Sequence, residues 1–264
     1  MAVFSPTNAK VHFKAYDGSF TDALSNTTIT QNNDVTMSSA QKLFGSGSMY
    51  MADFDDSITF DNDSLFDVGS GDYTVGFWFH PTQFTTYDRL FATDVSSNQN
   101  PLRIYNHNGS IQVYAESTTD DTTSHDYMMG YYLPTLGGGV DEWYHIMVQR
   151  SSGTSTLYIN GVSRATSTMS YNITGSTNPT LGADTDAAIT GVKGYIQDFF
   201  WTADSVSFTQ ADFDPSTPEP IAFTTTSPSI SSFSTSASSA ASGSSVTLSK
   251  DRDWETLSAV QKKS

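Results

Sequence analysis

The chain contains no cysteine among its 264 residues. Disulfide bonds, catalysis by a thiolate and metal sites built on cysteine are therefore excluded. Basic residues are also scarce, since 12 Lys and Arg stand against 28 Asp and Glu, which gives a net charge of -16. Because a surface this acidic repels phosphate groups, we exclude nucleic acid as a partner.

Targeting signals and long apolar runs are missing as well. The first ten residues, MAVFSPTNAK, contain no basic segment followed by an apolar stretch, so no signal peptide is expected. No part of the chain approaches the roughly 18 consecutive apolar residues that a membrane-spanning helix needs. We therefore expect no membrane insertion.

Aromatic residues are abundant, with 17 Phe, 13 Tyr and 4 Trp, and they can supply a core. Helical periodicity is nearly absent, whereas short alternating runs recur between turn residues, a pattern typical of a β-sandwich. These runs predict strands at Val11–Tyr16, Ser48–Ala52, Ser57–Phe60, Tyr73–His80, Arg89–Thr93, Leu102–Tyr105, Ile111–Glu116, Trp143–Arg150, Ser155–Asn160, Val162–Thr166 and Gly194–Thr202.

Two Asn-Gly pairs, Asn108-Gly109 and Asn160-Gly161, each lie between two of these predicted strands. An Asn-Gly pair readily adopts the positive φ angles of a type I′ turn, which joins two antiparallel strands directly. The sequence therefore predicts one antiparallel domain of two sheets.

Composition changes after Pro220, where Ser and Thr dominate residues 222–249. Such a stretch buries too little apolar surface to offset the entropy of ordering it. We interpret residues 215–249 as a linker or as short strands that order against a partner. Residues 250–264 contain a short amphipathic pattern, which predicts either an anchor helix or a fraying end.

Six segments in a fixed order carry a resemblance to a known family. They are His12–Gly18 with Phe20–Asp22, Ser39–Tyr50, Gly71–Phe79, Glu142–Arg150, Thr156–Gly161 and Gly194–Phe199. This series resembles the concanavalin A-like, laminin-G-type jelly-roll domains found in phage virion and bacterial surface proteins. The resemblance implies an all-β, two-sheet antiparallel jelly-roll sandwich over residues 1–214, followed by a Ser/Thr-rich C-terminal tail. It leaves function open, because this fold hosts lectins, glucanases and structural modules.

Catalytic patterns are missing. Glucanases of this fold carry alternating acids along one strand, and none of the four glutamates has an acidic partner at that spacing. The adjacent pairs Asp120-Asp121 and Asp141-Glu142 would point to opposite faces of a strand. His145 matches a family segment in which the imidazole is a hydrogen-bonded core residue. We therefore expect no enzymatic activity.

The resemblance also implies a calcium site. Asp17 follows the first predicted strand and Asp198 lies on the last long one, and the chain ends of such jelly rolls lie side by side. These two carboxylates would share a structural Ca²⁺ with backbone oxygens of a neighbouring loop. The alternative is that Asp17 only caps a turn with Gly18.

An insertion is expected at Asp120–Gly139, and it contains Tyr127, Met128, Met129, Tyr131 and Tyr132. An aromatic and methionine cluster on a loop is unusual when it faces water. It can contact another subunit or partner, pack on the domain itself, or bind a ligand. In the last case the three tyrosines would stack on a sugar ring.

The leading hypothesis is a non-catalytic virion protein of a phage, as a head decoration, tail or fibre module. It would form a homo-oligomer, contact other virion proteins through its C-terminal tail, and either coat the particle or attach to a glycan of the host surface. The alternative is a carbohydrate-binding module of an adhesin on the bacterial cell surface.

Overall fold

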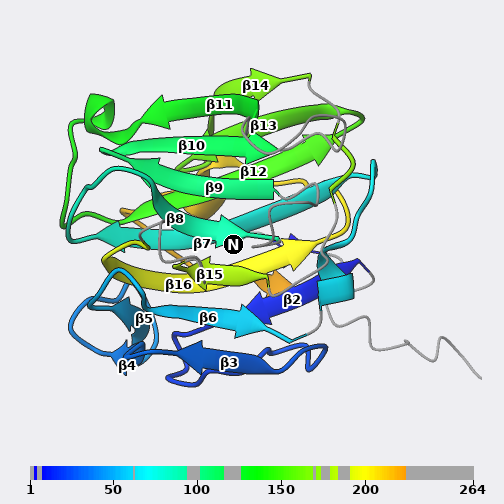
Figure 1. The fold of residues 1–264 in the computed structure, drawn as a ribbon. Coiled ribbons are helices and arrows are strands. Elements are labelled where there is room, and N and C mark those ends of the chain that lie inside the picture. Colours follow the sequence, from blue (N-terminus) through cyan, green and yellow to red (C-terminus); the bar gives the residue numbers. More distant parts are fainter. Residues whose placement is uncertain are drawn as a thin grey trace, which may run out of the picture. The chain divides into compact units, whose positions relative to one another are not determined.

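Two antiparallel sheets pack face to face as a sandwich (Figure 1). The structure, a computed structural model, describes residues 3–4, 8–61, 63–93, 102–115, 126–168, 171–173, 179–183 and 191–223. They lie within one compact unit, Met1–Thr226. This unit ends 12 residues after residue 214, where the sequence predicts the end of the domain. The remainder of the predicted linker and the predicted anchor at 250–264 lie outside the described residues.

The first sheet has seven strands in the order β11-β10-β9-β8-β15-β6-β3. Their bounds are β3 Ile29–Asn32, β6 Ser57–Phe60, β8 Asp88–Ala92, β9 Leu102–His107, β10 Ser110–Ala115, β11 Asp126–Tyr132 and β15 Thr180–Gly182. A 3-10 helix, η2 (Leu133–Leu136), follows β11 directly. The predicted insertion loop at Asp120–Gly139 is therefore wrong for residues 126–136, which form an edge strand and this helix.

The second sheet runs β14-β13-β12-β7-β16-β5-β4, and β2 pairs with β16 beside it. The bounds are β2 Ala9–Phe13, β4 Thr36–Ser38, β5 Ser48–Met51, β7 Tyr73–Pro81, β12 Tyr144–Ser151, β13 Thr154–Ile159, β14 Val162–Ser167 and β16 Gly194–Thr202. Outside both sheets lie a parallel pair and two 3-10 helices: β1 Val3–Phe4, β17 Ala222–Phe223, η1 Asp63–Phe66 and η3 Gln210–Phe213.

The all-β, two-sheet antiparallel jelly-roll prediction is confirmed. Both Asn-Gly hairpins form as expected, with His107 paired to Ser110 and Ile159 paired to Val162. Asn108 and Asn160 adopt φ angles of 50° and 52°, the left-handed values that a type I′ turn requires. Within the described residues, no helix is long and apolar enough to cross a membrane.

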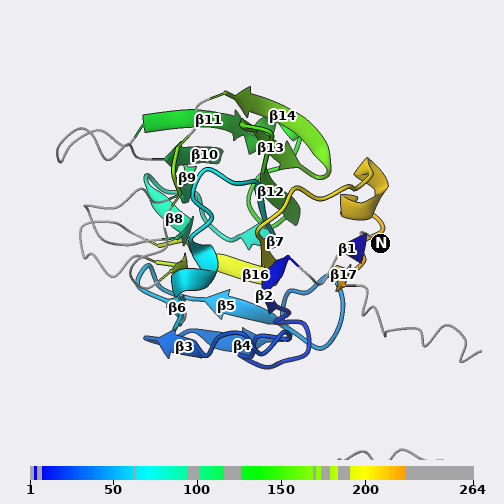
Figure 2. The same cartoon turned by 90° about the vertical axis from the view of Figure 1, so that its right-hand side faces the viewer.

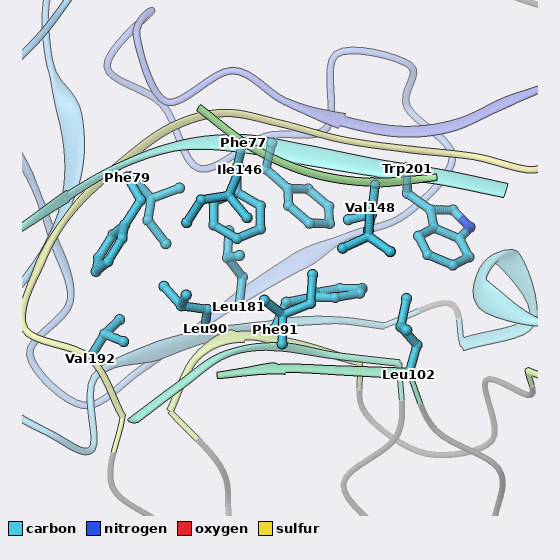
Figure 3. Packing of buried hydrophobic residues seen from close by; sticks show 14 of the residues in the cluster. Phe77, Phe79, Leu90, Phe91, Leu102, Ile146, Val148, Leu181, Val192 and Trp201 are labelled. Atoms are coloured by element: carbon cyan, nitrogen blue, oxygen red, sulfur yellow. The ribbon is translucent and has the colours of Figure 1, made fainter. Parts of the chain in front are cut away.

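The core lies between the sheets (Figure 3). Alternate residues of β7 and β12, among them Phe77 and Ile146, point inward against Leu181 and Phe91 of the seven-stranded sheet. Trp201 is fully buried among these rings, and its Nε1 donates a hydrogen bond to a backbone carbonyl at 2.9 Å. A large share of the aromatic residues therefore lies in the core between the two sheets.

A smaller apolar cluster covers the outer face of the eight-stranded sheet. Met147 of β12 and Phe200 of β16 pack there against Phe213 and Ile221, which come from the segment after β16. Figure 2 shows η3 and β17 beside the eight-stranded sheet, on the side away from β8, β9 and β10. Part of this outer face is therefore covered by the chain itself.

His145 lies beneath this cover. Its side chain is fully buried, and its ring stacks on Phe213 at 3.8 Å between centroids and meets Trp78 edge-on at 5.0 Å. The core position agrees with the resemblance. The resemblance also implies a hydrogen bond from the imidazole, and this is wrong, because neither ring nitrogen of His145 has a hydrogen-bond partner.

Candidate functional site

The hairpin of β9 and β10 determines which side chains lie on the outer face of the seven-stranded sheet. Its register pairs Tyr105 with Gln112 and Arg103 with Tyr114. Ile104, between two of these residues, is fully buried in the core. Because successive side chains of a strand point to opposite faces, Tyr105 and Tyr114 share the outer face.

The edge strand β11 adds a third ring to this face. Tyr127 pairs with Tyr114 across a β-bulge, and their ring centroids are 5.5 Å apart, while those of Tyr105 and Tyr114 are 5.4 Å apart. A Cβ atom at Gly130 would lie 2.7 Å from the Tyr127 hydroxyl oxygen, so this glycine makes room for the ring. Tyr127 is 51% exposed, which leaves the ring accessible to a ligand.

Tyr87 extends the row beyond β9. It is 57% exposed, and its ring lies 4.5 Å from that of His107. Burial raises the pKa of Tyr114, with smaller contributions from Tyr87, Tyr127 and Tyr105, so these three phenol groups lie near enough to act on Tyr114. We call these four residues, Tyr87, Tyr105, Tyr114 and Tyr127, the tyrosine platform.

Polar side chains fix the rings of the platform. The buried Arg89 donates from Nη2 to the Tyr105 hydroxyl at 3.0 Å, and its guanidinium lies 5.4 Å from the centre of that ring. The Tyr114 hydroxyl donates to Oε1 of Gln112 at 2.8 Å. The half-buried Gln112 also carries an amide nitrogen, a donor group beside the rings. Such a surface suits a ligand that has both an apolar face and a rim of hydroxyl groups.

The three tyrosines predicted as a ligand site do not all face the same way. Tyr127 belongs to the platform, and the 51% exposed Tyr132 pairs with Ser110 on the same outer side. Tyr131 pairs instead with Ile111, packs against the core and lies 4.9 Å beneath the guanidinium of Arg164. For Tyr131 the structure therefore shows self-packing, one of the alternatives predicted for this segment.

Three platform residues, Tyr87, Tyr105 and Tyr114, are absent from the residues predicted from the sequence. The signal for two of them was present, because the Asn108-Gly109 turn alone sets the register that places Tyr105 and Tyr114 on one face. Tyr87 has no such signal, since it lies before β8 in a left-handed backbone conformation with φ 62°.

The two residues of the predicted calcium site have other contacts. Asp198 is fully buried, with Oδ1 2.7 Å from Nε2 of His12 and Oδ2 accepting from the backbone N–H of Ile221 at 2.6 Å. The exposed Asp17 accepts from the backbone N–H of Ser19 at 3.1 Å, as a turn cap does. The described residues contain no group of three or more His, Asp or Glu side chains placed to hold a metal ion. In this arrangement Asp17 and Asp198 are not set to share a Ca²⁺ ion. The Ca²⁺ site itself stays a prediction.

A family model described as the concanavalin A-like lectin/glucanases superfamily matches residues 52–207, a stretch that contains the whole platform. No curated protein sequence matches this chain.

Several solved structures share the fold. Domain 4 of AbnA, an extracellular GH43 arabinanase from Geobacillus stearothermophilus solved with arabinotriose, has 18% identity and a TM-score of 0.56, with 80% of this chain and 96% of that chain covered. The ligand-binding domain of botulinum neurotoxin serotype D, solved with N-acetylneuraminic acid, has 13% identity and a TM-score of 0.57, with coverage of 76% and 48%. This chain spans about half of the toxin domain. At these identities the likeness concerns the fold.

Proposed function

This chain belongs to the concanavalin A-like lectin/glucanases superfamily, and we propose that it is a non-catalytic module that binds carbohydrate on its tyrosine platform. The observation that carries the proposal is the contact of the Tyr114 and Tyr127 rings on the outer face of neighbouring strands, next to Tyr105, which is only 4% exposed and supports this surface rather than offering a face of its own. A sugar ring offers C–H groups on its faces and hydroxyl groups at its edge. The first stack on phenol rings, and the second bond to amide and hydroxyl groups.

The absence of catalysis is part of the proposal. Hydrolysis of a glycosidic bond needs two carboxyl groups roughly 5 to 9.5 Å apart on either side of that bond. Asp141 and Glu142 are consecutive and exposed, and Asp120-Asp121 lies outside the described residues. The platform itself contains no carboxylate. The two related structures were solved with arabinotriose and with N-acetylneuraminic acid, which further supports a binding role.

Glycan binding should fail when the platform is truncated. Replacing Tyr127 or Tyr114 by Ala removes one stacking surface, and we expect at least a tenfold loss of affinity, about 1.4 kcal/mol. The measurement is retention on a glycan array, followed by titration of the best ligand.

The matched control is Tyr50→Ala, because Tyr50 is a half-buried tyrosine of β5 on the other sheet. This variant should bind like the parent protein. Equal losses in Tyr50→Ala and Tyr127→Ala, or a parent protein that retains no glycan on the array, would rule out the platform.

We also propose where the protein is displayed. The cysteine-free, Ser/Thr-rich composition favours surface display on a phage virion, as a homo-oligomer held through the C-terminal tail, over the bacterial adhesin. The described chain ends at β17, on the side of the sandwich away from β8, β9 and β10 (Figure 2).

Deletion of residues 250–264 tests the role of the tail. We expect the truncated protein to fold and to keep its glycan binding, but to be missing from the purified parent assembly. Normal incorporation of the truncated protein, measured by mass spectrometry of the particles, would contradict the role of the tail. It would not bear on the proposed glycan binding.

A further inference from the structure

A depression lies at the edge of the seven-stranded sheet that is farther from the platform. Residues 20–22 and 25–29, at and before the start of β3, line it together with Asp61, which follows β6. Its volume is about 510 Å³, within the range of small-ligand sites. Strands β8 and β15 separate β6 and β3 from β9, β10 and β11, so the depression and the platform are distinct places (Figure 1).

Asp22 gives the wall of the depression its shape. Its Oδ1 accepts from the backbone N–H groups of His12 at 2.8 Å and Leu24 at 3.1 Å, and its Oδ2 accepts from that of Asn26 at 2.8 Å. The side chain is buried, with a relative exposure of 6%. The Asp22 carboxylate is therefore committed to the fold of the loop, and a ligand must be recognised by other groups.

Three kinds of group remain for a ligand. Phe20 is half-buried, and its ring is held by stacking on the buried Phe13 at 5.9 Å. Asp61 is exposed, and its carboxylate is oriented by the Thr30 hydroxyl at 3.1 Å. Ser25 and Thr28 are exposed and add hydroxyl groups. An apolar ring thus lies among a carboxylate and hydroxyl groups.

These groups select against charged ligands. No Lys, Arg or His lines the depression, so nothing there offsets the charge of an anion. A divalent cation needs several oxygen ligands at once, and Asp61 is the one lining carboxylate that the loop itself does not use. A neutral saccharide matches better, because a carboxylate accepts hydrogen bonds from two neighbouring hydroxyl groups while a phenyl ring stacks on the C–H face.

We infer that this depression is a second saccharide site, specific for neutral sugars and independent of the platform. Phe20 provides the stacking surface, Asp61 accepts from sugar hydroxyl groups, and Ser25 and Thr28 complete the rim. Two such sites on one sheet would let a single domain hold two parts of a polysaccharide, or two chains, and so gain avidity.

The test maps binding by two-dimensional NMR of the ¹⁵N-labelled protein, titrated to millimolar concentrations of arabinotriose, maltotriose and cellotriose. We expect at least one of these neutral sugars to shift the backbone amide signals of Ser25, Thr28 and Asp61. The shifts should persist in Tyr127→Ala, which removes one stacking ring of the platform. They should require at least tenfold more sugar in Asp61→Asn, an exposed and nearly isosteric change that leaves the fold intact.

Phe20→Ala should have the same effect as Asp61→Asn, while the control Asp55→Asn, at another exposed aspartate, should not. The inference is overturned if no neutral sugar shifts these amides, if only Ca²⁺ or N-acetylneuraminic acid does, or if Asp61→Asn binds like the parent protein. Shifts at the depression without shifts at the platform would contradict the proposed function and leave this site standing.

Discussion

Acidification will remove several kcal/mol of stability from this protein through the buried imidazole of His145, and replacing His145 by Phe will abolish that contribution. Burial lowers the pKa of His145 from its ordinary 6.5 to about 3. Between pH 6.5 and pH 3, His145 is protonated in the unfolded chain but stays neutral in the folded protein. Stability is therefore fully present above pH 6.5 and falls towards pH 3, by about 1.4 kcal/mol per pH unit and on the order of 5 kcal/mol in all.

Denaturant unfolding at pH 7, 5 and 4 measures this effect. His145→Phe keeps a ring against Phe213 and forfeits no hydrogen bond, because neither imidazole nitrogen has a partner. His145→Leu serves as a smaller second variant. The control is His107→Gln, at a half-buried histidine of the other sheet, which should keep the acid dependence of the parent protein. If both His145 variants lose stability with acid as steeply as the parent protein, the buried imidazole is not the cause.

Asp198→Ala will lower the free energy of unfolding by about 3 to 5 kcal/mol. The change leaves His12 and the backbone N–H of Ile221 buried without the carboxylate that they contact at 2.7 and 2.6 Å. It also places alanine at a φ of 54°, a left-handed conformation that costs most residues roughly 1 kcal/mol or more. Asp198→Asn should lose less, because asparagine tolerates this conformation and keeps one acceptor oxygen.

Urea unfolding with and without a chelator separates these contacts from a bound ion. We expect the loss in Asp198→Ala to be the same under both conditions, since hydrogen bonds account for it. A parent protein that falls to the stability of Asp198→Ala on chelation would instead establish the predicted Ca²⁺ site at Asp17 and Asp198.

The sequence predicts those parts of the fold whose signals are local. The Asn160-Gly161 turn and the core-facing alternation of Tyr73, Val75, Phe77 and Phe79 in β7 depend on neighbouring residues, and both are as expected. The same reasoning reaches part of the candidate site, because the Asn108-Gly109 register alone places Tyr105 and Tyr114 together.

Other parts depend on contacts distant in the sequence. β11 contains Gly130 within a run of Tyr and Met that lacks alternation, so nothing local marks it as a strand. β15 has only three residues and is held by β6 and β8 on either side. The depression at Asp61 is formed by a loop and a strand end far apart in the sequence, and no spacing rule brings them together.

A crystal structure of the protein with the oligosaccharide that it retains best on a glycan array tests the proposed function most directly. We expect a sugar ring against the rings of Tyr114 and Tyr127, with a sugar hydroxyl bonded to the amide of Gln112. A well-ordered sugar elsewhere on the protein, with these two tyrosines free of it, would contradict the platform as the binding site.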